Sequence, residues 1–275
     1  MQVIKSSGEK EKFSGKKIYY SIREAGGSKS LAKEAVKFIK KRYTKDVSTN
    51  EILITLLNFL KKEPGVSQRY GLKRAILSLG PSGFPFESFF ARVLEYYGFK
   101  TTTGNKIRGK RIIHEVDIVA IKDKKWMIEC KYHNEAGTIT KLHPAMYTYA
   151  RFLDLGKHHF DSPWLVTNTR CSEDAIEYAK GVGLRVTAWK FPKDENLEKL
   201  IEEKKLYPIT ILKNLSERVL NEIYQLKIVV AKDLLDFSPS ELAKKTSLNE
   251  KDAVKVLEEV KIISAWKDFY LISRS

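Results

Sequence analysis

EVDIVAI, at residues 115–121, and WMIECK, at residues 126–131, are two apolar runs joined by the polar segment KDKK. Runs of this length on either side of a four-residue turn are typical of antiparallel strands. Alternate residues of a strand share a face, so Glu129 and Lys131 point the same way. Charged side chains on apolar strands are costly to bury unless they bind something. We therefore expect Asp117, Glu129 and Lys131 to form a functional site on a β-hairpin.

The chemistry of this hairpin fits a divalent metal ion. Carboxylate and carbonyl oxygens are the ligands that hard cations such as Mg²⁺ or Mn²⁺ prefer, so Asp117, Glu129 and the backbone carbonyl of Cys130 are the expected ligands. Such a metal polarises a phosphoryl oxygen and lowers the pKa of an attacking water. Lys131 would orient that water and offset the developing charge. The alternative is a surface hairpin with solvated charges, because an Asp…Glu-x-Lys string is a weak pattern by itself.

The residues around the hairpin predict an α/β (α+β) domain. The expected elements are a helix over Pro85–Tyr97 that ends at Gly98, a strand over Phe99–Thr103, the hairpin, a helix over Thr140–Leu155, a strand over Pro163–Thr167, a helix over Ser172–Gly181 and a strand over Leu184–Trp189. Helical spacing of apolar residues and short apolar runs indicate these elements. Their order favours a mixed central sheet with helices on both faces.

The same region resembles a nuclease family. Asp117 with Glu129-x-Lys131 resembles the PD-(D/E)xK nuclease signature. The segments Phe86-Glu87, His114–Asp117, Glu129–Lys131 and Tyr149–Phe152 look like those of Mrr-type restriction endonucleases, which cleave DNA and share a core with archaeal Holliday-junction resolvases. The resemblance implies a restriction-endonuclease-like fold, with Asp117, Glu129 and Lys131 as catalytic residues and Glu87 as an auxiliary acid. Many Mrr-type sequences have Gln at the position of Glu129, so this chain has the fuller set of metal ligands.

A second resemblance lies at the N-terminus. The pattern V-x-K-x-x-G-x-x-E-x-F-x-x-x-K-I-x-x-S-I begins at Val3 and looks like the ATP-cone, the nucleotide-binding regulatory module of ribonucleotide reductases and of the repressor of their genes. It implies a mostly helical domain with a small β-hairpin, and helical patterns run over about Lys29–Arg42, Thr49–Lys61 and Val66–Leu79. By this resemblance Lys5, Glu11, Lys17 and Thr49 bind ATP or dATP. A lysine in the first turn of a helix, as expected for Lys17, suits a triphosphate.

The whole chain has a net charge of +16, and the positive charge is concentrated in its N-terminal part. Residues 1–80 contain 18 basic and 7 acidic side chains, residues 81–192 contain 17 and 12, and residues 193–275 contain 15 and 15. A basic surface implies polyanionic partners, either nucleotide phosphates or DNA. The cluster Lys106–Arg111 precedes the strand of Asp117, where it would hold phosphates without reading their sequence.

The C-terminal region is predicted to be helical. The expected helices are Leu212–Tyr224, Ala231–Leu235, Pro239–Thr246 and Glu250–Val260, the third with Ser238 as N-cap and Pro239 at its first position. The short helices resemble tandem helix-hairpin-helix modules, although the hairpin glycines are missing. A packing or dimerisation element is the open alternative.

These patterns together predict three domains: an ATP-cone at residues 1–80, a catalytic domain at 81–192 and a helical domain at 193–275. The expected function is a metal-dependent DNA endonuclease regulated by an adenine nucleotide, which acts as ligand because no G-x-x-x-x-G-K-[ST] loop is present. The alternatives are a nucleotide-responsive DNA-binding regulator with an inactive nuclease fold, and a structure-selective, resolvase-like nuclease.

Two expectations concern the setting of the protein. The sequence shows no signal peptide and no stretch of about 18 apolar residues, so we expect a soluble, cytoplasmic protein without membrane contact. Cutting both DNA strands with one site per chain requires a homodimer, a higher homo-oligomer or two successive nicks.

Overall fold

The computed structural model describes residues 1–275 except 6–7, 64, 81–83, 157, 214 and 266–275. The chain forms two compact units. One contains Met1–Ala75, Ile211–Glu222 and Leu234–Ser275, and the other contains Ile76–Thr210 and Ile223–Asp233. The C-terminal region therefore contributes residues to both units. The domain boundaries after residues 80 and 192 stay predictions, and the first falls beside residues 81–83, which are outside the described residues.

The second unit is built on a five-stranded sheet with the strand order β10-β8-β6-β5-β4. Its strands are β4 (Lys100–Arg108), β5 (Ile113–Ile121), β6 (Lys125–Lys131), β8 (Ser162–Thr167) and β10 (Arg185–Thr187). Strands β4, β5 and β6 pair antiparallel, whereas β6, β8 and β10 pair parallel. The predicted mixed sheet is confirmed. The two apolar runs around residues 122–125 form β5 and β6, which are adjacent in the sheet.

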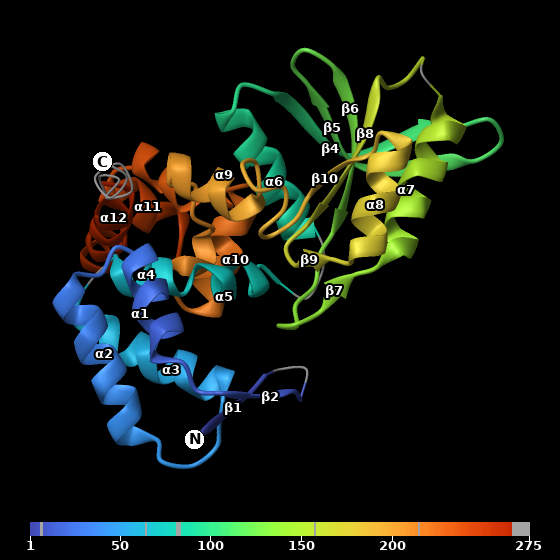
Figure 1. The fold of residues 1–275 in the computed structure, drawn as a ribbon. Helices are drawn as coiled ribbons and strands as arrows, with labels where there is room; N and C mark the ends of the chain where they lie inside the picture. The colour runs from blue at the N-terminus through green and yellow to red at the C-terminus, as the bar shows by residue number, and fades with distance from the viewer. Residues whose placement is uncertain (6–7, 64, 81–83, 157, 214, 266–275) are drawn as a thin grey trace, which may run out of the picture. The chain divides into compact units, whose positions relative to one another are not determined.

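Helices flank this sheet as expected. They are α6 (Phe84–Tyr96), α7 (Leu142–Leu155) and α8 (Glu173–Val182), and a further helix, α9 (Leu197–Lys204), contacts α6. In Figure 1, α7 and α8 lie together beside one side of the sheet and α6 lies on the other. Phe86, Phe89 and Phe90 on α6 are fully buried, and the ring of Phe90 meets that of Trp164 on β8 edge-on at 5.6 Å. This aromatic core fixes α6, and with it Glu87, against the sheet.

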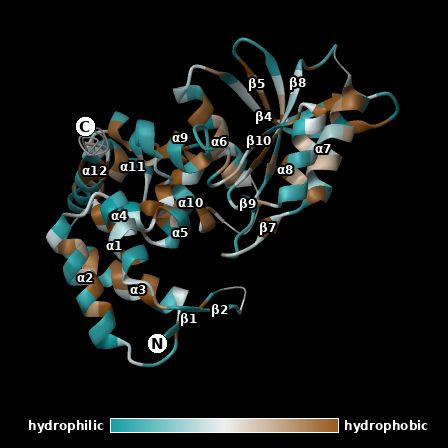
Figure 2. Ribbon diagram, in the orientation of Figure 1, coloured by the Kyte–Doolittle hydropathy of each residue, from teal (hydrophilic) through white to brown (hydrophobic). Residues whose placement is uncertain are grey.

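The helices begin where the sequence provides a cap. Ser172 accepts the N–H of Ala175 and starts α8, and Asn196 accepts the N–H of Lys199 and starts α9. Helix α9 was not among the expected elements. In Figure 2 many helices alternate hydrophilic and hydrophobic along their length, as amphipathic helices do.

The N-terminal unit begins with a small sheet. Strands β1 (Gln2–Ile4), β2 (Lys10–Lys12) and β3 (Val47–Ser48) form it in the order β2-β1-β3. Strands β1 and β2 pair antiparallel, which confirms the small hairpin, and β3 joins β1 in parallel. The helices that follow are α1 (Gly15–Glu24), α2 (Lys29–Arg42), α3 (Thr49–Phe59), the 3₁₀ turn η1 (Leu60–Lys62), α4 (Val66–Tyr70) and α5 (Leu72–Leu77).

The single helix expected over Val66–Leu79 is wrong, because α4 and α5 are separate. Gly71 ends α4, and its N–H donates to the carbonyls of Ser67 and Gln68. Glycine costs more conformational entropy than other residues inside a helix, so it favours the end of one. Buried apolar residues of α1, α2 and α3, among them Ile22, Ala35 and Leu56, close the core of this unit.

The C-terminal elements are shorter or longer than expected. They are the 3₁₀ turns η2 (Ile209–Ile211) and η3 (Ala231–Asp236), and the helices α10 (Glu217–Gln225), α11 (Pro239–Lys245) and α12 (Glu250–Ser264). Ser238 caps α11 as predicted, and Pro239 is at its first position. A two-stranded sheet of β7 (Ile139–Thr140) and β9 (Arg170–Cys171) completes the fold. No helix among the described residues could span a membrane.

Candidate functional site

The backbone departs from a regular sheet next to Asp117. The β5–β6 ladder runs from Ile121–Lys125 to Ile118–Ile128. Just beyond its end, the carboxylate of Asp117 accepts the backbone N–H of Cys130 at 2.7 Å. On the other side, the β4–β5 register passes from Thr103–Ile118 to Asn105–Val116, and Gly104 between these pairs has a φ of +64°. Asp117 therefore lies where its strand is irregular on both sides, and its side chain holds β6 in place of a ladder hydrogen bond.

Three of the predicted acids influence one another electrostatically. Burial raises the pKa of Glu129 to about 7, and repulsion from Asp117 adds to this rise. Burial followed by repulsion from Asp117 and Glu115 raises the pKa of Glu87 to about 7. The pKa of Asp117 is raised mainly by burial, which outweighs the hydrogen bond from Cys130. The structure thus brings Glu87, Asp117 and Glu129 together in a place that favours a cation.

A cation from the chain itself already meets this cluster. Arg151 on α7 forms an ion pair with Glu129, and its other amino group donates to the hydroxyl of Tyr147 at 2.8 Å. Its guanidinium carbon lies 4.6 Å from the centre of the Tyr147 ring. Only 10% of the Arg151 side chain is exposed, and its buried Nε has no hydrogen-bond partner among the described residues. No local sequence pattern indicates this contact, although Arg151 lies within the Tyr149–Phe152 segment.

The donor set suits a hard metal ion in its chemistry. Asp117, Glu129 and the Cys130 carbonyl offer only oxygen, which is the preferred ligand of Mg²⁺ and Mn²⁺. Within the ranges that the structure describes, no group of three or more His, Cys, Asp or Glu side chains is arranged to hold a metal. The expected ligand set is smaller than such a group, because it has two carboxylates, Asp117 and Glu129, and the backbone carbonyl of Cys130.

The backbone just beyond Lys131 is held firmly. Lys131 itself ends β6 with an exposed side chain. The buried side chain of Asn168 accepts the N–H of His133 at 2.9 Å and donates to the carbonyl of His133 at 2.7 Å. His133 also contacts the buried hydroxyl of Thr140 at 3.0 Å. These bonds fix the end of β6, so they position Lys131 relative to the acids.

The four predicted nucleotide-binding residues lie close together in the N-terminal unit. Glu11 forms ion pairs with Lys17 at 2.9 Å and with Lys5 at 3.3 Å. The hydroxyl of Thr49 donates to the carbonyl of Ile4, the residue before Lys5, at 3.2 Å. The hydrogen bond from Lys17 is the main cause that lowers the pKa of Glu11. Lys17 lies in the first turn of α1, whose N-cap is Ser14, as the sequence analysis expected.

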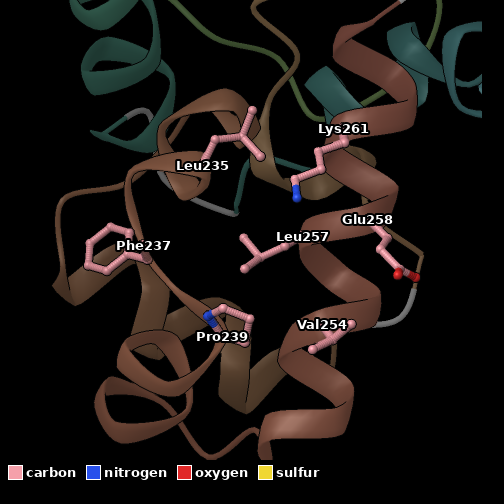
Figure 3. A pocket seen from close by; sticks show the side chains of 7 residues that line it. All are labelled: Leu235, Phe237, Pro239, Val254, Leu257, Glu258 and Lys261. Carbon is pink, nitrogen blue, oxygen red and sulfur yellow. The ribbon is translucent and has the colours of Figure 1, made fainter.

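Two hollows in the described part of the chain are lined by none of the residues of these two clusters. One, of about 170 Å³, is in the C-terminal region and is lined by Leu235, Phe237, Pro239, Val254, Leu257, Glu258 and Lys261. Figure 3 shows Leu235, Pro239 and Leu257 facing the same space. The other, of about 290 Å³, is lined by Phe38, Arg42, Thr55, Asn58 and Phe59 on α2 and α3. Neither is lined by Glu87, Asp117 or Glu129.

Comparison with protein families matches three parts of the chain. A model of the ATP cone domain matches residues 1–74, a model described as restriction endonuclease matches residues 80–193, and a model described as AF1548-like, C-terminal matches residues 207–264. An uncharacterized protein of Archaeoglobus fulgidus is 44% identical over 172 residues, which are 62% of this chain and 97% of that protein. This chain belongs to the AF1548-like family.

A solved structure supports the same assignment. The crystal structure of AF1548, a protein of unknown function, is 41% identical and has a TM-score of 0.60, covering 67% of this chain and 100% of that chain. Protein VC1899 from Vibrio cholerae has 17% identity, covers 68% of this chain and 52% of its own, and its TM-score of 0.31 is too low to establish a shared fold. The AF1548-like chain therefore has the restriction-endonuclease-like domain and the ATP-cone that its sequence predicted.

Proposed function

We propose that this AF1548-like protein is a DNA endonuclease of the PD-(D/E)xK type that requires Mg²⁺ or Mn²⁺ and responds to ATP or dATP. The observation that supports this most is the meeting of Asp117, Glu129 and Glu87 in a partly buried cluster next to Lys131. This cluster lies inside the segment matched to restriction endonucleases. Burial raises the pKa values of Glu87, Asp117 and Glu129, so their charged forms destabilise the fold. A role in binding a cation accounts for the presence of such acids.

Each residue has a distinct part in the proposed reaction. Asp117, Glu129 and the Cys130 carbonyl would hold the metal, and Asp117 also fixes β6 through the Cys130 N–H. A bound divalent cation supplies charge that polarises the phosphate and acidifies a water. Lys131, exposed at the end of β6, orients the attacking water and stabilises negative charge on the phosphate. Glu87 lies across from these residues on α6 as an auxiliary acid.

Arg151 adds a step that the family resemblance does not include. Its guanidinium neutralises Glu129 in this structure. When Glu129 is released to hold a metal, Arg151 becomes free to hold a phosphate oxygen, for which a guanidinium is well suited. The ion pair also favours the second candidate function, a nucleotide-responsive DNA-binding regulator that does not cut, because a guanidinium on Glu129 offsets the negative charge that would attract a metal.

The ATP-cone is proposed to control this activity. Lys5 and Lys17 are both paired with Glu11. Binding of a triphosphate would draw these lysines toward its charge. The altered cone would then change DNA cleavage or the proposed homo-oligomer by thermodynamic coupling.

One experiment separates the two candidate functions. Supercoiled plasmid, modified plasmid and a four-way junction are incubated with the full chain in Mg²⁺, in Mn²⁺ and in EDTA, each with and without ATP or dATP. An endonuclease nicks or linearises at least one substrate only when the metal is present. Binding to all three DNAs without any cleavage would instead support the non-cutting regulator.

A further inference from the structure

Strand β5, which carries Asp117, also forms a hairpin with β4, and the tip of this second hairpin precedes Asp117 in the chain. Strands β4 and β5 pair from Lys100–Ile121 to Arg108–Ile113, and the N–H of Gly109 donates to the carbonyl of Ile112 at 2.8 Å. The tip is therefore a tight turn at residues 109–112. Because β4 is the edge strand, this hairpin borders the sheet, and in Figure 1 it extends outward from it.

The tip combines positive charge with exposed apolar side chains. The sequence KIRGKR at residues 106–111 has four cations and no acid, and all four cations are exposed. Directly after them, Ile112 and Ile113 are 60% and 59% exposed. No other described isoleucine, leucine, valine or phenylalanine is as exposed as these two. Two neighbouring exposed isoleucines on a basic tip favour a ligand that has both negative charges and apolar surfaces.

The tip is held in one position by the neighbouring helix. The carboxylate of Asp154 on α7 bonds to Nε2 of His114 at 2.7 Å and accepts the backbone N–H of Lys110. A Cβ on Gly109 would come within 2.1 Å of the Asp154 carboxylate, so a larger residue there would displace the Asp154 side chain from its present contacts. An element fixed in this way loses little conformational entropy when it binds a ligand.

We propose that this tip is a wedge for DNA whose base stacking is interrupted, such as a branch point, bulge or mismatch. Lys106, Arg108, Lys110 and Arg111 hold backbone phosphates on either side. Ile112 and Ile113 insert between the bases, as apolar wedges of minor-groove and architectural proteins do. Unstacking a regular base step costs a few kcal/mol, which DNA with an existing discontinuity avoids.

This inference rests on the proposed function for DNA as the substrate and adds the class of DNA. Asp117 lies four residues from Ile113 on the same strand, which is roughly 13 Å. That distance corresponds to about four nucleotides along one strand. The proposed cut therefore falls within about four nucleotides of the discontinuity.

The test measures binding without cleavage. The full chain is titrated in EDTA with a bulged duplex and a four-way junction, each carrying 2-aminopurine at the discontinuity, and with an intact duplex of the same sequence that carries it at the corresponding position. The variants are Ile112→Ser/Ile113→Ser and, as matched control, Ile121→Ser. Ile121 is on the same strand and 45% exposed, but lies at the opposite end of β5.

The wild type and Ile121→Ser should prefer the interrupted DNAs by about tenfold or more and raise 2-aminopurine fluorescence, since tenfold equals about 1.4 kcal/mol. The double serine variant should lose both the preference and the fluorescence change while it binds the duplex as before. A Lys110→Gln/Arg111→Gln variant should have a shallower slope of log binding constant against log salt concentration for all DNAs. The change should correspond to the loss of about two phosphate contacts.

Two results overturn the wedge. One is a double serine variant that keeps the wild-type preference. The other is a double serine variant that sediments as a monomer where the wild type sediments as a dimer, with an unchanged preference among the DNAs. That result would make the tip an interface between copies of the chain. Either result leaves metal-dependent cleavage by the wild type intact, so it is distinguishable from failure of the proposed nuclease function.

Discussion

The proposed catalytic cluster (Glu87, Asp117 and Glu129) and the proposed nucleotide cluster (Lys5, Glu11, Lys17 and Thr49) both pair a glutamate with a cation, yet the two glutamates respond in opposite ways. Glu129 is only 18% exposed, and its pKa rises to about 7 despite the attraction of Arg151. Glu11 is partly exposed between two lysines, and its pKa is lowered. The comparison teaches that burial together with repulsion from neighbouring acids outweighs one paired cation at Glu129, whereas hydrogen bonds from two lysines prevail at the more exposed Glu11. The buried cluster is therefore the one proposed to bind a metal, whereas a nucleotide at the exposed cluster would have to compete with Glu11 for the two lysines.

The largest expected effect concerns the metal ligands. Asp117→Ala or Glu129→Ala should lower Mg²⁺-dependent cleavage at least about 10³-fold, because each removes a charge that holds the catalytic ion. DNA binding should stay equal or become stronger, since a source of repulsion with phosphate is gone. Single-turnover cleavage and DNA titrations measure both. Asp123→Ala, which removes an exposed acid from the β5–β6 turn, is the control and should cut normally. Wild-type rates in either ligand variant would refute the site.

Lys131 should affect rate more than affinity. Lys131→Ala is expected to lower turnover about 10²- to 10³-fold, in the range of other electrostatic stabilisers. Its DNA affinity should change about twofold or less, because one exposed lysine contributes little among many phosphate contacts. Parallel measurements of single-turnover rate and dissociation constant decide this. Weaker binding with an unchanged rate would make Lys131 a phosphate anchor.

The exposed cluster should respond to nucleotide. Lys5→Ala/Lys17→Ala should weaken ATP and dATP binding about tenfold or more, because both cations that face the triphosphate are lost. Calorimetry with and without DNA measures this and the reciprocal coupling. Lys10→Ala is the matched control, since Lys10 lies on β2 but pairs with Asp46. Absence of nucleotide binding by the wild type at millimolar ligand would leave the cone as a structural or DNA-contacting element.

Arg151 should compete with the metal. Arg151→Gln is expected to bind Mn²⁺ about fivefold more tightly in the absence of DNA, a change of about 1 kcal/mol, because the metal no longer competes with a guanidinium for Glu129. Its cleavage rate should nevertheless fall, since the guanidinium is missing from the phosphate. Paramagnetic titration of Mn²⁺ measures the affinity, with the exposed Arg170→Gln as control. Weaker Mn²⁺ binding would show that Arg151 holds Glu129 in position for the metal.

The smallest expected effect is on stability. The folded-state pKa of Glu87 is about 7, above its ordinary 4.5. Glu87 therefore lowers the free energy of unfolding fully above about pH 7 and not at all below about pH 4.5. The shift corresponds to at most about 3 kcal/mol, and solvent screening of this half-buried group reduces that to about 1 kcal/mol. Glu87→Gln should therefore raise the melting temperature in EDTA at pH 8 but not at pH 4. Equal effects at both pH values would contradict the buried charge.

The sequence by itself determined the elements whose signals are local. Alternating apolar residues around KDKK predicted β5 and β6, and Ser238-Pro239 predicted the start of α11. Strand alternation and helix capping depend on neighbours a few residues apart, so they can be recognised without the fold. The spacing from Asp117 to Lys131 belongs to this class, and it identified the catalytic candidates, whose roles stay predictions.

Only the tertiary structure decided which distant side chains meet. Arg151 reaches Glu129 across 22 residues, and Asp154 reaches His114 across 40. Neither pair leaves a local pattern, because both depend on how α7 packs against the sheet. The division of the C-terminal region between two units is likewise invisible in its helical periodicity. Helical spacing indicates that a face will be buried, but the surface that covers it is set by packing over the whole chain.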